Sequence, residues 1–464
     1  MKAHQGSTKA ASRPTWQRRL HSAVLRDTRE FSSLHEEWDE LYRNCPSATP
    51  FSSWEWLYSW WEAYGELYEL RLITLRDPGS GLLVGLLPLM VRRGRLLLLG
   101  GDRVTLYNPI TPYKDFLIRK GWEEPVARIA ARDLKEMGGW RVADLQELMP
   151  QAAAWDIFRY WDGPKSSIPI TDYLLIRTNS WEELLSSLSR NARKAARRTL
   201  RRAEQDGLRC VPAGPEDAER AATTLVELHR QLWRGRRIDP EDLTPRYETF
   251  MRAAARRMTA RGIGRISEFR RDDDDGEEQV LVSQFLLFDK DFVGAYVIGA
   301  SEEASRRYQF MTLYIWDAME VAHRRSNAYV SLMFHASWEK LRWASEVVSS
   351  HRAILGRSKA SFWVPYAGYY VVRNRYYTLR SKAQVYVHSE DAPRWVKKAT
   401  ASYYALVLYP YSEGAPSWVK NLTERYYALR GKYGYGWLRY RFELARARRQ
   451  MHRDNHLTQT PSNR

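Results

Sequence analysis

Apolar residues along the first part of the chain follow two different periods, and these periods predict where helices and strands form. In residues 34–43 and 53–64, apolar side chains recur every three or four positions, which is typical of amphipathic helices. Short apolar runs bounded by turn residues predict strands instead. Strands are expected at residues 70–75, 83–91, 96–99, 140–146 and 168–176, with a further helix at 122–137.

The second part of the chain repeats a similar order of elements. Helices are predicted at 180–207, 215–233, 244–261, 308–323 and 338–344, and strands at 208–211, 263–269, 280–288, 292–299 and 329–333. Hairpin strands followed by a helix and another strand indicate an α+β fold, in which mixed, mostly antiparallel sheets are flanked by helices. We therefore expect two similar halves, residues 24–178 and 179–362.

The predicted helix at 180–207 carries a strongly basic face. Ser180 and Glu183 have the spacing of a capping box, Gly207 suits the end of a helix, and Ser189 has the character of a second cap. Steps of three and one place the basic residues on about half of the helix surface. They are Arg190, Arg193, Lys194, Arg197, Arg198, Arg201 and Arg202. This face is either simply solvated, or it binds phosphates or acidic sugars at the junction of the halves.

The overall charge favours acidic partners without choosing among them. The 464 residues carry a formal net charge of +18, which suits nucleic acid, anionic lipid, phosphorylated cofactors or acidic glycans. The two cysteines, Cys45 and Cys210, lack metal-type spacing and indicate a reducing, cytoplasmic setting. The apolar run at 82–91 is about half the length that a bilayer requires, so no transmembrane helix is expected.

Several chemical signatures are absent from the sequence. It contains no Walker loop, Rossmann glycine fingerprint, His-Glu-x-x-His motif or Gly-x-Ser-x-Gly motif, which disfavours NTPases, dehydrogenases, zinc peptidases and common esterases. The acidic run at 272–278 has no second ligand cluster beside it in the sequence. We therefore interpret it as a solvated hairpin tip and expect no metal site.

The two ends of the chain differ in composition from the middle. Residues 1–23 are predicted to form a disordered basic tail, and residues 363–464 a basic, mainly helical extension rich in tyrosine and tryptophan. Within the extension, residues 392–406 match residues 415–429 at ten of fifteen positions. Three roles stay open for these duplicated units: a helical appendage on the main body, a membrane-surface patch, or an aromatic platform for nucleic acid.

Several segments carry a resemblance to a known family. PFSSWEWLYSWWEAYG at 50–65, GLLVGLLPLM at 81–90 and LSRNARKAARRTLRRAEQDG at 188–207 resemble the CelD-like acetyltransferases. These bacterial proteins belong to the Gcn5-related N-acetyltransferase superfamily and are tied to exopolysaccharide and cellulose production. The segments at 294–326 and 328–343 are similar to the later part of the same pattern. The family is similar in turn to Fem-type aminoacyl transferases, which carry two such half-folds in one chain.

The resemblance covers roughly residues 24–360 and implies a catalytic site. An acyltransferase of this kind takes acyl-CoA and passes the acyl group to an amine or hydroxyl of a sugar or cell-envelope precursor. The family usually has Asp-x-x-x-Gly…Tyr-Lys after the last strand. Here Ser331, His335 and Glu339 stand at the Asp, Gly and Tyr positions, and Lys340 is kept. His335 or Glu339 is therefore the expected base, with Lys340 assisting.

Further side chains are expected to bind the substrates. The turn before residue 308 carries arginines where acyl-CoA transferases have a glycine-rich turn for the donor pyrophosphate. Acidic groups of the donor or acceptor are expected to meet the basic helix, and a tyrosine of the strand at 292–299 is expected to line the site. The expected binding residues are Arg190, Arg193, Lys194, Arg197, Tyr296, Arg306, Arg307 and Lys340.

Two other functions stay open from the sequence. A Fem-like transferase would use aminoacyl-tRNA, and the positive charge would suit RNA. A non-catalytic scaffold that kept the fold would bind an anionic polymer or membrane through the basic helix and the duplicated units. The expected location is the cytoplasm, with peripheral contact at the inner face of the membrane.

Overall fold

The computed structural model describes residues 19–101, 110–233, 240–272, 275–327, 329–334 and 338–358 of the chain. Most of the expected basic tail, His335 and the extension with its duplicated units lie outside these residues. Strand β1 (His21–Leu25) pairs with the next strand from His21 onward. Residues 21–23 are therefore part of the sheet and do not belong to a disordered tail.

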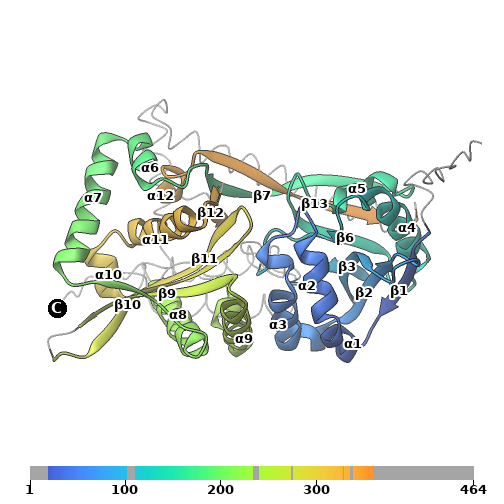
Figure 1. The fold of residues 1–464 in the computed structure, drawn as a ribbon, viewed down its shortest axis with the longest axis horizontal. Helices are drawn as coiled ribbons and strands as arrows, with labels where there is room; N and C mark the ends of the chain where they lie inside the picture. The colour runs from blue at the N-terminus through green and yellow to red at the C-terminus, as the bar shows by residue number, and fades with distance from the viewer. Residues whose placement is uncertain are drawn as a thin grey trace, which may run out of the picture.

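One mixed sheet of 13 strands runs through the described part of the chain (Figure 1). The strand order is β1-β2-β3-β4-β6-β13-β7-β12-β11-β10-β9-β8, and β5 pairs separately with β3. Helices cover the sheet on both faces. The predicted α+β class with two tandem, mostly antiparallel halves is confirmed.

The first half follows the predicted segments closely, because its apolar positions have a clear period. Helix α3, for example, begins where the Ser53 side chain accepts the backbone N–H of Trp56, which is an N-cap. Helices α1 and α5 are too short to show a period and were not predicted. The bounds are β1 (His21–Leu25), α1 (Thr28–Ser33), α2 (His35–Arg43), α3 (Trp54–Tyr64), β2 (Glu69–Arg76), β3 (Leu83–Arg92), β4 (Arg95–Leu98), β5 (Leu117–Ile118), α4 (Glu123–Glu136), β6 (Val142–Leu148), α5 (Ala154–Tyr160) and β7 (Lys165–Ile176).

The second half begins with the basic segment, which forms two helices. Ser189 caps the second of them, as predicted, by accepting the N–H of Ala192. Ser180 caps the first, but its own N–H donates to Thr178, so the reciprocal half of the expected capping box is not formed. The bounds are α6 (Trp181–Ser187), α7 (Arg190–Gln205), β8 (Arg209–Pro212), α8 (Ala218–Leu232), α9 (Pro245–Arg261), β9 (Gly264–Asp272), β10 (Glu278–Asp289), β11 (Phe292–Ala300), α10 (Glu302–Arg307), α11 (Phe310–Arg325), β12 (Tyr329–Phe334), α12 (Trp338–Leu341) and β13 (Glu346–Gly356).

The two halves repeat one order of strands and helices. In the first half, antiparallel β2, β3 and β4 lead through α4 to β6, which pairs with β4 in parallel. In the second half, antiparallel β9, β10 and β11 lead through α11 to β12, which pairs with β11 in parallel. The sheet order is therefore nearly symmetric about its centre, where β13 and β7 lie side by side.

The last strand of each half is exchanged with the other half. β7 ends the first half in sequence, yet it pairs with β12 of the second half. β13 ends the second half and pairs with β6 of the first half. The two exchanged strands also pair with each other over ten registered positions. This exchange joins the halves into one sheet, so the sequence boundary expected at residues 178/179 does not separate two sheets.

One hydrophobic cluster extends across both halves. Helices α1, α2 and α3 of the first half and α8 and α9 of the second half contribute to one cluster on the same face of the sheet (Figure 1). Trp56 of α3 contacts Phe250 of α9 and Tyr296 of β11, each at a ring-centroid distance of 5.0 Å. Arg257 of α9 pairs with Glu62 of α3 at the rim, at 2.5 Å. On the other face, α4 and α5 cover the first half, and α6, α7 and α11 cover the second.

Candidate functional site

The second half contains a place where two parallel strands separate, which we call the second-half fork. β11 and β12 pair from Phe292–Gly294 to Tyr329–Ser331, and among the described residues no further pairing between them follows. On its other side, β12 pairs with β7, and the register of that pairing shifts between Ser331 and Phe334. Ligands of open sheets with parallel strands bind in the crevice beyond the carboxyl ends of those strands. The second-half fork is therefore the candidate site.

Side chains replace the missing strand partners beyond the fork. The Tyr314 hydroxyl of α11 donates to the carbonyl oxygen of Ala295 on β11. The Lys340 ammonium of α12 donates to the carbonyl oxygens of Leu332 and Phe334 on β12, at 3.0 and 3.1 Å. Buried backbone carbonyls require such partners. The two edges of the fork are thus held apart by specific hydrogen bonds from α11 and α12.

A tyrosine from the first half lies over the apex of the fork. The hydroxyl of Tyr113 is 2.7 Å from Oγ of Ser331, and Ser331 Oγ also accepts the backbone N–H of Met333 at 3.1 Å. The ring of Tyr113 packs against Tyr173 and Phe292, with centroid distances of 4.7 and 5.1 Å. Burial raises the pKa of Tyr113 above its usual range, so the phenol is neutral. The first half therefore supplies part of the second-half fork.

The corresponding fork of the first half is closed by charges. The Asp144 carboxylate of β6 is buried and accepts hydrogen bonds from Arg352 of β13 and Arg95 of β4. Asp144 pairs with Leu97 as Ser331 pairs with Gly294. By the registers of the strands, Asp144 is equivalent to Ser331. Arg95 is equivalent to Phe292. Arg352 is equivalent to Tyr173. A buried ion cluster thus fills the first-half fork, where the second half has neutral groups.

Left-handed backbone marks the same region. Among the residues that the structure describes, three left-handed residues that are not glycine lie outside tight turns and helix ends: Tyr113 at φ 50°, Met333 at φ 60° and Glu147 at φ 62°. Glu147 is buried on β6, and its carboxylate accepts hydroxyl hydrogen bonds from Thr171, Tyr173 and Ser350. Residues other than glycine rarely adopt this backbone conformation, and those that do concentrate at functional sites. Their position where the halves meet supports the choice of site.

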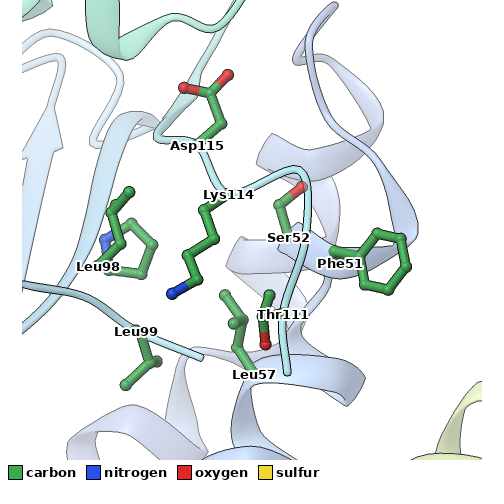
Figure 2. Close-up of a pocket in the computed structure, with 9 residues that line it drawn as sticks. Phe51, Ser52, Leu57, Leu98, Leu99, Thr111, Lys114 and Asp115 are labelled. Atoms are coloured by element: carbon green, nitrogen blue, oxygen red, sulfur yellow. The ribbon is translucent and has the colours of Figure 1, made fainter. Parts of the chain in front are cut away.

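The segment that carries Tyr113 borders a small pocket on its other side. Figure 2 shows Lys114 reaching between Leu98, Leu99 and Leu57, with Thr111 beside it. Asp115 points away from this space (Figure 2) and accepts the backbone N–H groups of Ala153 and Ala154 at the start of α5. Burial raises the pKa of Asp115 to about 6, although four hydrogen bonds oppose the shift. The segment 110–116 is thus fixed on both sides.

The basic helix lies away from the fork and from the junction of the halves. Helix α7 packs on α11 at the outer side of the second half (Figure 1), so the expectation of a basic helix between the halves is wrong. Arg190, Lys194 and Arg197 are exposed, while Arg193 is half-buried and donates to the carbonyl of Leu188 at 3.3 Å. These four residues form an outer surface and do not converge on the fork.

The other predicted binding residues are also dispersed. Tyr296 is buried in the core on β11, and its hydroxyl donates to the carbonyl of Ile110 at 2.7 Å. Arg306 is exposed and pairs with Glu302. Arg307 forms two hydrogen bonds with Asp206 at the end of α7, at 2.6 and 2.5 Å, and holds the pKa of that carboxyl at about 2. Arg307 therefore anchors α7, and Tyr296 lies beside the fork without a free hydroxyl.

The residues predicted around the end of β12 have mixed outcomes. Lys340 lies at the fork, and burial lowers its pKa to about 8. Glu339 is placed in α12, directly beside Lys340 in the chain. His335 lies outside the described residues. Tyr113 was not predicted as a site residue, because it lies in an aperiodic segment, NPITPYKDF, in which an aromatic residue stands between two prolines and a charged pair.

Neither a metal cluster nor a membrane-spanning helix is found where the structure describes the chain. Within the described ranges, no group of three or more His, Cys, Asp or Glu side chains is arranged to hold a metal ion. None of the described helices has the length and apolar character that crossing a membrane requires.

The sequence of the second half matches a known domain family. Residues 190–339 match the acetyltransferase (GNAT) domain family. The matched range lies within the second half of the chain. This match includes α7, both strands of the second-half fork and α11, and it begins after the strand exchanged from the first half. No curated protein sequence matches the chain.

Several solved structures are similar to the chain at low sequence identity. A structure of FemX has a TM-score of 0.48 and 10% identity, over 72% of this chain and 96% of the other. A structure of L-PGS from Bacillus licheniformis has a TM-score of 0.43 and 12% identity, over 73% of this chain and 95% of the other. A tandem GNAT protein from the clavulanic acid biosynthesis pathway has a TM-score of 0.39 and 12% identity, over 74% and 100%.

Proposed function

We propose that the chain is an acyltransferase of the CelD-like group. It would move an acyl group from acyl-CoA to an amine or hydroxyl of a sugar or cell-envelope precursor, in the cytoplasm or at the inner face of the membrane. The observation that carries this proposal is the acetyltransferase domain match over residues 190–339, which includes both strands of the second-half fork. CelD-like membership and the exopolysaccharide setting rest on the sequence resemblance.

The proposed reaction takes place in the second-half fork. The acceptor nitrogen or oxygen forms a bond to the acyl carbon, the carbon–sulfur bond breaks, and the acceptor proton passes to a base. His335 or Glu339 is the proposed base, because both follow β12 at the end of the fork. The first-half fork is filled by Asp144 and its two arginines, which favours a single donor site per chain.

The test of this function is thiol release from acyl-CoA. The full chain is incubated with acetyl-CoA and amino-sugar or hydroxyl acceptors, and free thiol is measured for the wild type, His335→Ala and Glu339→Gln. Loss of turnover in at least one variant, with an unchanged melting temperature, supports the assignment. Unchanged turnover in both removes these two residues from the mechanism. No thiol release and no stabilisation by any acyl-CoA would argue against the function.

A second function is favoured by the charge of α7. Arg198 and Arg201 of α7 are exposed and form no ion pair with the described residues, which suits contact with an anionic polymer or membrane, whether the acceptor itself or a separate partner. A Fem-like use of aminoacyl-tRNA belongs to this group of functions. Binding of tRNA with a steep salt dependence would support it, and sedimentation with anionic vesicles would support membrane contact.

A further inference from the structure

We propose that Tyr113, a first-half residue, limits the acyl group that the second-half fork accepts to a short one. The inference rests on the proposed acyl transfer and deepens it by naming the class of donor and the residue that selects it. A side chain on a segment between β4 and β5 would thus determine the specificity of a site formed by β11 and β12.

The apex of the fork has no spare volume. A Cβ atom added at Gly294 would lie 2.6 Å from the ring of Phe292 and 3.3 Å from the sulfur of Met333. The first distance is far below a normal carbon–carbon contact, so even one methyl group forces a neighbour to move. An acyl chain that reaches the apex must therefore be short, or a side chain must give way.

The other face of the fork is closed by packed helices. Ala295 of β11 and Val330 and Leu332 of β12 are completely buried against α11, whose Ile315 and Ala318 belong to the same cluster. Displacing α11 would disrupt a close-packed core, which is strongly destabilising. Additional volume for a longer acyl chain can therefore come more cheaply from the face that Tyr113 covers.

Tyr113 is a side chain on that face whose removal leaves the sheet intact, and it is the one that contacts Ser331 at the apex. Phe292 and Tyr173 lie on paired strands, but Tyr113 lies on a segment outside the strands. Tyr113 is 3% exposed, and its ring packs against Tyr173, Phe292 and Phe51, the last at a centroid distance of 6.0 Å. Its hydroxyl contacts the neutral Ser331, so removing Tyr113 leaves no buried charge without a partner. Removing an arginine of the first-half fork would leave the buried Asp144 carboxylate with less compensation.

The experiment compares wild type, Tyr113→Phe, Tyr113→Leu and Tyr113→Ala with acetyl-, butyryl-, hexanoyl- and octanoyl-CoA. Thermal stabilisation and thiol release are measured for every pair. We expect the wild type and Tyr113→Phe to favour acetyl-CoA over octanoyl-CoA by at least about tenfold in kcat/KM, the scale expected when extra methylenes have no space. Tyr113→Ala should reverse that preference, and Tyr113→Leu should shift it partway.

Three results would overturn the proposal, and they are distinguishable. An equal kcat/KM of the wild type for octanoyl-CoA and acetyl-CoA would contradict the short-acyl assignment, even if the variants do not fold. A folded Tyr113→Ala or Tyr113→Leu chain with the wild-type length profile shows that another residue sets the limit. If no acyl-CoA binds or turns over, the proposed function and this inference are both wrong. If acyl-CoAs bind without a preference for length, only the inference is wrong.

Discussion

Asp144 and Ser331 occupy equivalent positions in the two halves and have opposite surroundings. Asp144 pairs with Leu97 across the parallel strands of the first half, as Ser331 pairs with Gly294 in the second. Two arginines bind the buried Asp144 carboxylate, whereas the neutral phenol of Tyr113 binds Ser331. Removing a partner from a buried charge is strongly destabilising, so we expect the ion cluster to keep the first-half fork filled. We therefore expect substrates to bind in the second-half fork.

The ion cluster of the first half should be structural. Replacing Arg352 by Met leaves the Asp144 carboxylate with less compensation in a buried position, so we expect the free energy of unfolding to fall by about 3–5 kcal/mol. Urea denaturation measures this change. Arg132→Met, which removes an exposed partner of Asp133, should cost less than about 1 kcal/mol. Equal losses in the two variants would contradict the structural role of the cluster.

Asp115 should make the stability of the first half depend on pH. Burial raises its pKa to about 6 from 3.8, so between these values the folded chain binds more protons at Asp115 than the unfolded chain does. The contribution of this group to the free energy of unfolding therefore falls as pH rises through this window, by an amount on the order of 3 kcal/mol.

The measurement for Asp115 is the difference in unfolding free energy between the wild type and Asp115→Asn. Taking the difference cancels other carboxyls such as Asp206, whose pKa is lowered to about 2 and whose contribution has the opposite sign. The stability of the wild type relative to the variant should decline from pH 4 to pH 6. A difference that does not change over this range would show that Asp115 is ionised in the folded chain at pH 4.

Much of the fold was predictable, because local signals agree with the final structure. Thr244 caps α9 by accepting the N–H of Tyr247, and Gly262 ends that helix in the left-handed conformation. Strand β13 was missed, since its sequence EVVSSHRAILG mixes polar and apolar residues without a strict alternation. Its partners, β6 and β7, come from the other half, and no local pattern carries that information.

The site was predictable only in part, for a related reason. The family pattern pointed to Lys340, which does lie at the fork. The sequence of α7 specifies a cationic face, but packing of Ala196 and Ala203 decides that this face points outward. Tyr113 and Ser331 are 218 residues apart in the chain and meet where the two halves pack together. Such a contact depends on tertiary packing, which single-sequence periodicity does not contain.

Lys340 should stabilise the end of β12 more strongly at high pH. Burial lowers its pKa to about 8 from 10.5, so between these values the unfolded chain binds more protons at this lysine. Its contribution to the free energy of unfolding therefore rises with pH across the window. Lys340→Met also leaves the carbonyls of Leu332 and Phe334 without this donor, and should cost about 1–3 kcal/mol.

The measurement for Lys340 is chemical denaturation of the wild type and Lys340→Met at several pH values. The difference between the two should grow from pH 8 to pH 10. Lys340→Arg is the matched control, because it keeps a donor but cannot lose its charge in this range, and it should remove the pH dependence. A pH-independent difference for Lys340→Met would contradict the assigned shift.

The outer face of α7 should bind anions and contribute little to stability. Within the described residues, Arg197 is the α7 cation with an ion pair, to Glu182 at 2.8 Å. Lys194, Arg198 and Arg201 are exposed and have no such pair there. Reversing these three to Glu should change the free energy of unfolding by less than about 1 kcal/mol, because exposed sites without partners contribute little.

The same triple variant should lose binding to phosphatidylglycerol vesicles and to polygalacturonate in sedimentation assays. Arg252→Glu with Arg256→Glu is the matched control, since both arginines are exposed and pair with Glu219 on the other face of the second half. The control should bind as the wild type does at each salt concentration. Equal binding by the triple variant would assign the anion contact to another surface.

Calorimetric titration with acetyl-CoA tests the central claim, that the second-half fork is the donor site. We predict one site per chain in the wild type and in Arg95→Met, which alters the first-half fork. Binding should be lost in Gly294→Val, whose side chain would collide with Phe292, in a chain that still melts cooperatively. Two sites in the wild type, or unchanged affinity in a folded Gly294→Val chain, would contradict the account.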